Sequence, residues 1–176
     1  MANSENWSVN KVRTTCYKGL SGLLLLLCAL IGLACTAKPN SVNQTNNKPR
    51  ELLLLFQKTP CYGSCPAYNA NFYSDGSIRY EGFRHAPVQD TLWLQLSKEQ
   101  LSLVKESLES IDYPSLESTY NSPYTDLPST YLTFYKDGKE VRRIKHQQNG
   151  PEKLRKLIDY LDELVMELVQ ENEKRY

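Results

Sequence analysis

The sequence lacks the motifs on which the common enzyme classes depend. It has only two histidines in 176 residues, and no serine stands in a G-x-S-x-G motif. The zinc motif H-E-x-x-H and a glycine-rich phosphate loop are also missing. Carboxylates that pair in space leave no trace in sequence, so a hydrolase with a spatially assembled site stays open. The sequence itself nominates no catalytic residue and no cofactor, and it predicts a protein that is not an enzyme.

A large excess of charge of one sign is missing as well. The chain has 21 basic and 20 acidic residues, which give a formal net charge of +1. Proteins that bind nucleic acids usually carry a strongly basic surface. This balance therefore predicts that nucleic acid is not a partner.

The longest apolar run stands close to the N-terminus. Lys11, Arg13 and Lys18 precede the run GLSGLLLLLCALIGLAC, which ends at Cys35. A basic flank, an apolar stretch and a small-residue end are typical of an export signal. Because Cys35 follows the letters IGLA, it is similar to the lipid-attachment cysteine of bacterial lipoproteins. We therefore predict a leader over residues 1–35 and a lipoprotein anchored in the cell envelope, on the periplasmic side or in the outer membrane.

Two other interpretations of this segment remain open. Cleavage after Ala34 without lipid attachment would give a secreted protein. An uncleaved run would be a single-pass anchor, because residues 19–37 just reach the roughly 20 residues that a membrane-spanning helix needs. All three interpretations place the remaining chain outside the cytoplasm. Residues 36–50 contain too few large apolar side chains to order themselves, so they predict a disordered tether.

Residues 51–172 predict a single α+β domain. Apolar and polar residues alternate on both sides of Asp75-Gly76 and of Asp137-Gly138, and Asp-Gly is a dipeptide typical of tight hairpin turns. The similar letters FYSDG and FYKDG mark these two hairpins. Further strands are predicted at residues 52–57 and in the segment TLWLQL.

Two amphipathic helices complete the predicted domain. The first follows Ser97 and Gln100, which form a capping-box pattern, and the second follows Gly150-Pro151. The second helix carries a continuous stripe of leucine, isoleucine and valine. Both apolar faces are buried economically if the two helices pack on one face of an antiparallel sheet of five or six strands, built from the two hairpins.

Cys61 and Cys65 are the only cysteines of the predicted domain, and they bracket the letters YGS. Exported thiols meet an oxidising environment, so a disulfide is the expected state of this pair. Closing so small a loop stabilises a protein by only about 2 kcal/mol through loop-closure entropy. The expected effect is therefore mainly geometric, as a clamp that fixes the turn between the first strand and the first hairpin.

Copper or thiol-redox chemistry is the alternative for the same pair. The pattern C-x-x-x-C-P is similar to the copper motif of Sco-type chaperones, which add a distal histidine, here His146 or His85. Sulfur and imidazole are ligands that suit copper. In those chaperones a helix follows the second cysteine, whereas Pro66 here leads into an alternating segment. No further cysteine pair is present to complete a zinc site.

Tyrosine is abundant, with 12 residues, several of which flank predicted loops. Tyrosine also favours strands, but it is enriched in recognition surfaces because it joins apolar area to a polar tip. Tyr62, Tyr124 and Asp126 are therefore predicted to form a binding surface on the loops. We expect a membrane-tethered extracytoplasmic binding domain, with an envelope protein or a glycan as its partner.

The second hairpin is rich in basic residues, among them Arg142, Arg143, Lys145 and His146. Such a hairpin is either a charged edge that discourages unwanted sheet pairing or a surface for acidic lipid headgroups or a polyanionic polymer.

Three segments of the chain resemble one bacterial family. They are LLLFQKTPCYGSCPAYNANFYSDGSIRYEG, YTDLPSTYLTFYKDGKEV and NGPEKLRKLIDYLDEL, and the most specific element is the block P-C-Y-G-S-C-P-x-Y at residues 60–68. The family is known as domain of unknown function 6438 (DUF6438), common in exported lipoproteins of Bacteroidota. The resemblance covers residues 52–169. It implies an exported α+β domain without an established activity, and it supplies no catalytic residue.

Overall fold

The computed structural model describes residues 49–124 and 126–175. The predicted leader over residues 1–35, the predicted lipid-attachment residue Cys35 and the predicted tether up to residue 48 lie outside the described residues. No helix in the described ranges has the length and apolar character that crossing a membrane requires.

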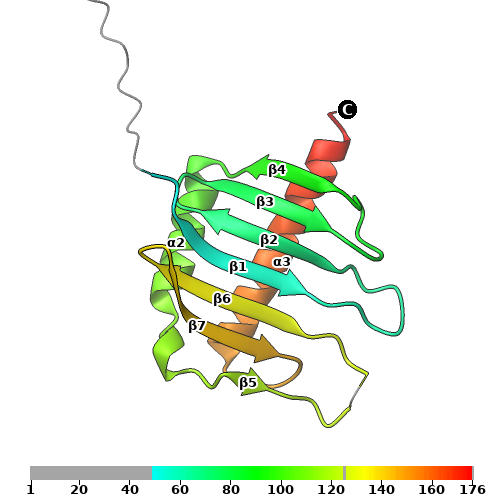
Figure 1. Cartoon of the computed structure of the whole chain (residues 1–176), viewed down its shortest axis with the longest axis vertical. Coiled ribbons are helices and arrows are strands. Elements are labelled where there is room, and N and C mark those ends of the chain that lie inside the picture. The colour runs from blue at the N-terminus through cyan, green and yellow to red at the C-terminus, as the bar shows by residue number, and fades with distance from the viewer. Residues whose placement is uncertain (1–48, 125, 176) are drawn as a thin grey trace, which may run out of the picture. The chain divides into compact units, whose positions relative to one another are not determined.

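A seven-stranded sheet forms the body of the domain (Figure 1), in the order β4-β3-β2-β1-β6-β7-β5. All neighbouring strands are antiparallel except β5 and β7, which are parallel. The predicted α+β class is confirmed, but the prediction of a purely antiparallel sheet of five or six strands is wrong, because the sheet is mixed and larger. The strands are β1 (Leu52–Lys58), β2 (Tyr68–Tyr73), β3 (Ser77–Gly82), β4 (Thr91–Gln95), β5 (Thr119–Tyr120), β6 (Thr130–Lys136) and β7 (Lys139–His146).

The unexpected strand is β5, which has only two residues and lies outside every strand that the sequence predicts. It is held by β7: the N–H of Lys145 donates to the carbonyl oxygen of Ser118, and the N–H of Gln147 donates to that of Tyr120, each at 2.9 Å. Two residues are too few for a periodic pattern, so this strand has no signal of its own in the sequence.

Both predicted hairpins are present. The pair β2 and β3 turns at Asp75-Gly76, and the pair β6 and β7 turns at Asp137-Gly138. Asp137 and Gly138 have φ angles of 51° and 72°, the positive values that a tight hairpin turn uses. Both turns lie at the end of the sheet where β1 begins, and this end is called the hairpin end below.

Two helices and one turn of 3₁₀-helix accompany the sheet. They are α2 (Lys98–Ser110), η1 (Tyr113–Ser115) and α3 (Glu152–Glu173). The predicted capping box is formed, because the N–H of Gln100 donates to Ser97 Oγ at 3.1 Å and the N–H of Ser97 donates to Gln100 Oε1 at 2.8 Å. This exchange satisfies N–H groups at the start of the helix that otherwise have no partner.

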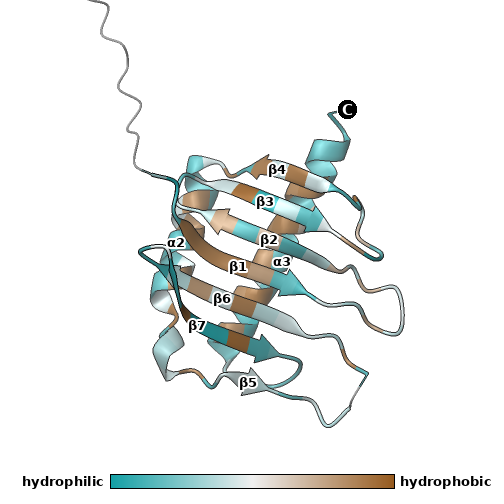
Figure 2. Ribbon diagram, viewed as in Figure 1, coloured by the Kyte–Doolittle hydropathy of each residue, from teal (hydrophilic) through white to brown (hydrophobic). Residues whose placement is uncertain are grey.

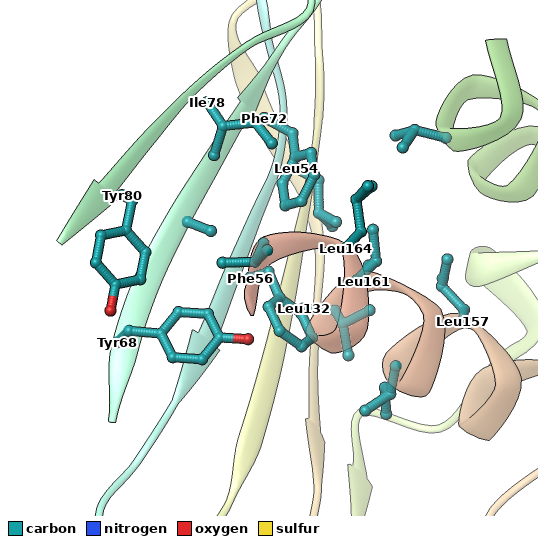
Figure 3. Close-up of a cluster of buried hydrophobic side chains, with 14 of the residues drawn as sticks. Leu54, Phe56, Tyr68, Phe72, Ile78, Tyr80, Leu132, Leu157, Leu161 and Leu164 are labelled. Atoms are coloured by element: carbon teal, nitrogen blue, oxygen red, sulfur yellow. The ribbon is translucent and has the colours of Figure 1, made fainter. Parts of the chain in front are cut away.

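Helix α3 crosses one face of the sheet and closes the core against it (Figure 1). Figure 3 shows Leu54, Phe56 and Leu132 of the strands directed toward the helix. The predicted apolar stripe of α3 is buried along its whole length, at Leu154, Leu157, Ile158, Leu161, Leu164, Val165 and Leu168. Hydrophobic and hydrophilic residues follow one another in turn along β3 and α3 (Figure 2), as elements with one buried face require.

The other face of the sheet carries no helix in the part of the chain that the structure describes (Figure 1). The alternate strand positions that point to this open face include Gln57, Asn69, Asn71, Tyr131 and Arg143, which are all at least partly exposed. Because no described helix covers these polar and aromatic side chains, they are available for recognition.

Candidate functional site

Four loops lie at the end of the sheet opposite the hairpin end. They are residues 59–67, called the clamp loop, residues 83–90, the described residues 121–124 and 126–129, and residues 147–151. The N–H of Thr59 donates to the carbonyl oxygen of Ser129 at 3.0 Å, and the N–H of Phe83 donates to that of Ala67 at 2.8 Å. The clamp loop is therefore fixed on one side by residues 126–129 and on the other by residues 83–90. This end of the sheet is called the clamp end.

Cys61 and Cys65 are joined by a disulfide in the structure, with their Cα atoms 5.6 Å apart. Cys61 Sγ also accepts hydrogen bonds from the N–H groups of Gly63 and Cys65, each at 3.3 Å. The bond closes a compact bend whose tip, Tyr62, is 94% exposed. This geometry is that of the predicted clamp.

A pocket of about 430 Å³ opens on the open sheet face beside the clamp loop. Its floor comes from β1, β2, β6 and β7, and its wall comes from the loops on either side. We call it the clamp-end pocket, and it is lined by Gln57, Lys58, Thr59, Pro60, Ala67, Asn69, Phe83, Tyr131 and Arg143.

The polar groups of the clamp-end pocket contact one another. Gln57 Nε2 donates to Asn69 Oδ1 at 3.0 Å, and Arg143 Nη2 donates to Gln57 Oε1 over a long 3.5 Å. The guanidinium carbon of Arg143 lies 4.8 Å from the centre of the Tyr131 ring, within the range of a cation–π interaction. Phe83 adds an aromatic ring that is 47% exposed. The pocket thus combines one arginine, two amides and two aromatic rings.

A hydrogen-bonded group supports the pocket from the helix side of the sheet. Asp162 on α3 accepts from Tyr68 Oη at 2.5 Å, and it forms an ion pair with Lys58 Nζ. Burial raises the pKa of the Tyr68 hydroxyl, and the negative charge of Asp162 raises it further, so this hydroxyl stays protonated and donates. Lys58 ends β1 and Tyr68 begins β2, so Asp162 ties both roots of the clamp loop to α3.

The structure places the predicted binding residues at the clamp end but outside the pocket. Tyr62 is on the clamp loop, and Tyr124, which is 64% exposed, shares the neighbouring loop with the exposed Asp126. None of the three lines the clamp-end pocket. Exposure and loop position, the two signals used for the prediction, select residues at the tips of loops rather than on a concave floor.

The histidines have partners within the domain. His146 Nε2 lies 2.6 Å from the carbonyl oxygen of Asn149, and Arg84 Nε donates to His85 Nε2 at 3.1 Å. Over the described ranges, no group of three or more histidine, cysteine or acidic side chains is placed to hold a metal ion. A copper site of Cys61, Cys65 and a histidine requires reduced sulfurs, and it stays a prediction.

A larger cleft of about 650 Å³ lies between the end of α2 and the strands β1 and β6. There the Tyr113 ring stacks on Phe134 with centres 4.6 Å apart, and Lys105 Nζ donates to the carbonyl oxygen of Ser74 at 3.0 Å. The lining of this cleft mixes basic and acidic side chains, Lys105, Lys136, Glu109 and Asp112, whereas the clamp-end pocket contains no acid and its polar groups contact one another. We therefore take the clamp-end pocket as the candidate site.

Comparison with known proteins gives one match. Residues 52–165 match the family described as Domain of unknown function (DUF6438). No curated protein and no solved structure is significantly similar to the chain.

Proposed function

Since the chain belongs to the DUF6438 family, whose description assigns no activity, we propose that it is a membrane-tethered extracytoplasmic binding domain. Its partner is an envelope protein or a glycan, which it holds in the clamp-end pocket. The observation that carries this proposal is the concave group of Gln57, Asn69, Tyr131 and Arg143 on a sheet face that no described helix covers.

The position of the pocket relative to the start of the domain supports a tethered binding protein. Arg50, at the hairpin end, forms an ion pair with Asp75 at 2.9 Å and lies 5.1 Å from the centre of the Trp93 ring. The seven residues of β1 separate this corner from the clamp end by roughly 20 Å, at about 3.3 Å per residue. A ligand in the pocket is thus bound away from the point where the tether joins.

Four of the seven exposed large apolar side chains of the described residues lie in the loops of the clamp end. They are Tyr62, Phe83, Tyr124 and Leu127, whereas Trp93, Leu103 and Val141 lie singly on β4, α2 and β7. Aromatic rings exposed around a polar pocket are typical of recognition surfaces. This clustering favours binding at the clamp end over binding at the hairpin end.

The first test replaces one amide of the pocket floor. Asn69→Ala is expected to reduce the partner recovered by the full-length protein from solubilised envelopes about five-fold, the effect of roughly one net hydrogen bond. Asn71→Ala is the matched control, because Asn71 lies on the same strand and the same face but does not line the pocket. Tyr124→Ala tests the loop tip separately. Bound proteins and sugars are identified in each eluate.

Equal recovery with wild type, Asn69→Ala and Asn71→Ala would contradict the pocket as the binding site. Loss with Tyr124→Ala alone would move the site to the loop tips.

The second test removes the disulfide. The Cys61→Ser/Cys65→Ser variant is expected to lose about 2 kcal/mol of unfolding free energy, because the unfolded chain is no longer restrained by the small loop. Binding is expected to weaken as well, since Thr59, Pro60 and Ala67 of the clamp loop form one wall of the pocket. Urea unfolding and partner recovery measure the two effects. Unchanged values for both would contradict the clamp.

The same variant tests the alternative function. Stoichiometric Cu(I) binding by the reduced wild-type protein, lost in Cys61→Ser/Cys65→Ser, would support a copper-binding or thiol-redox envelope protein that uses His146 or His85.

A further inference from the structure

We infer that the ligand of the clamp-end pocket is a saccharide that carries a carboxylate. This inference rests on the proposed function and names the class of ligand for the same site. It follows from the charge of the lining, the free hydrogen-bonding groups of the amides and the position of the pocket within the sheet.

The lining of the pocket is positive. It contains Lys58 and Arg143 and no aspartate or glutamate. Lys58 Nζ is bound to Asp162 on the other side of the sheet, which leaves Arg143 as the charge that the pocket presents. Arg143 makes no ion pair with any of the described residues. A ligand of negative charge is therefore favoured.

Glu81, an acid on the open face, does not neutralise this charge. It lies opposite Asn69 in the register of β2 and β3, and it forms an ion pair with Arg79 at 2.7 Å. Its charge is thus compensated on the side of the sheet away from β7.

The guanidinium of Arg143 is suited to a carboxylate. The guanidinium carbon lies over the Tyr131 ring at 4.8 Å from its centre, and this cation–π contact uses none of the N–H groups along the edge of the planar group. Its one hydrogen bond to the described residues, to Gln57 Oε1, is long at 3.5 Å. Two parallel N–H groups of a guanidinium match the two oxygens of a carboxylate, which gives a stronger and better-oriented contact than a lysine gives.

The amides are suited to hydroxyl groups. The bond between Gln57 and Asn69 uses one donor and one acceptor, so one N–H of Gln57 and both N–H groups of Asn69 remain, beside the weakly used Gln57 Oε1. A sugar hydroxyl both donates and accepts, so neighbouring hydroxyls can satisfy donors and acceptors side by side. The exposed ring of Phe83 offers an apolar surface for the C–H groups of the sugar ring.

An extended peptide fits this site less well. Peptides that bind to a sheet by adding a strand need a free edge with unpaired backbone groups. The edges of this sheet are β4, β5 and the part of β7 before Lys145, whereas β1, β2 and β6, which form most of the pocket floor, are paired on both sides. Recognition in the pocket must therefore use side chains. Its volume of about 430 Å³ is that of a small-ligand site.

The test is calorimetric titration of the full-length protein in detergent with trigalacturonate, and with the neutral galactotriose as the comparison sugar. The wild-type protein is expected to bind the acidic sugar at least ten-fold more tightly than the neutral one. Arg143→Gln is expected to lose about ten-fold in affinity for trigalacturonate, the effect of removing a hydrogen bond to a charged group.

Lys145→Gln is the matched control. Lys145 lies on β7 and points to the same face, but it donates to Asn121 Oδ1 at 3.2 Å and does not line the pocket. Its affinity for trigalacturonate is expected to equal that of the wild type. If Arg143→Gln does not fold, Arg143→Lys keeps the charge without the two-pronged geometry, and a several-fold weaker affinity is expected.

Several results would overturn the inference. They are equal affinity for the two sugars, an equal loss in Arg143→Gln and Lys145→Gln, and no binding of either sugar. In each case, the amount of partner that Asn69→Ala recovers from solubilised envelopes tests the proposed function separately. If that effect persists, the pocket binds another class of partner, and if it is missing too, both proposals fail.

Discussion

Asp162→Ala is expected to lower the free energy of unfolding by about 2 to 3 kcal/mol. The largest part comes from Tyr68, a fully buried residue whose hydroxyl donates to Asp162 at 2.5 Å. A buried hydroxyl left without a partner costs about 1 to 3 kcal/mol. The ion pair with Lys58 adds less, because the two side chains are 24% and 30% exposed and water screens their attraction.

The control for this prediction is Asp159→Ala, which removes an exposed carboxylate one turn earlier on α3 and is expected to change stability by less than about 0.5 kcal/mol. Asp162→Asn keeps an acceptor for Tyr68 and is expected to fall between the two. Urea unfolding of all three variants measures the order. Equal midpoints for Asp162→Ala and Asp159→Ala would show that Tyr68 and Lys58 find other partners.

The elements with local patterns could be predicted from the sequence, and their spatial order could not. The alternation around Asp75-Gly76 and Asp137-Gly138 identifies two hairpins because strand period and turn chemistry are properties of neighbouring residues. That β1 lies between them depends on pairings far apart in the chain. The two similar segments meet there, since Phe72 and Phe134 both pair with Leu54, one from each side.

The clamp-end pocket shows why a candidate site on a sheet is difficult to predict from the sequence. Gln57, Asn69, Tyr131 and Arg143 come from four strands, and each is an ordinary polar or aromatic residue in an alternating segment. They become a site only because β1 pairs with both β2 and β6, and because α3 covers the opposite face. Neither fact has a local signal.

The basic second hairpin is another feature whose spatial arrangement the sequence did not predict. Arg142 and Arg143 are neighbours in sequence, but successive residues of a strand point to opposite faces. Arg142 donates to the carbonyl oxygen of Leu116, whereas Arg143 makes a cation–π contact with Tyr131 at the pocket. The predicted basic surface is therefore divided, and of these two residues only Arg143 lines the clamp-end pocket.

Gly82→Ala is expected to be the most damaging single-methyl change in the domain, with a loss of about 3 kcal/mol or more. A Cβ atom at residue 82 would lie 1.7 Å from the carbonyl oxygen of Val88 and 2.8 Å from Tyr80 Oη. Overpacking of this kind costs about 1 to 3 kcal/mol when side chains can adjust. Here the obstacle is backbone, so the loop of residues 83–90 must move and strain its hydrogen bonds to Gly82 and Tyr80.

The displaced loop carries Phe83, so Gly82→Ala is also expected to weaken binding in the clamp-end pocket. Gly63→Ala is the matched control, because the nearest atom to its added Cβ, Cys61 Sγ, lies 3.7 Å away. That variant is expected to stay within about 0.5 kcal/mol of the wild type. Thermal or urea unfolding of both variants compares the two glycines. A Gly82→Ala protein as stable as Gly63→Ala would mean that the loop of residues 83–90 can leave β3 without cost, and the pocket wall that contains Phe83 would then not be rigid enough to define a binding site.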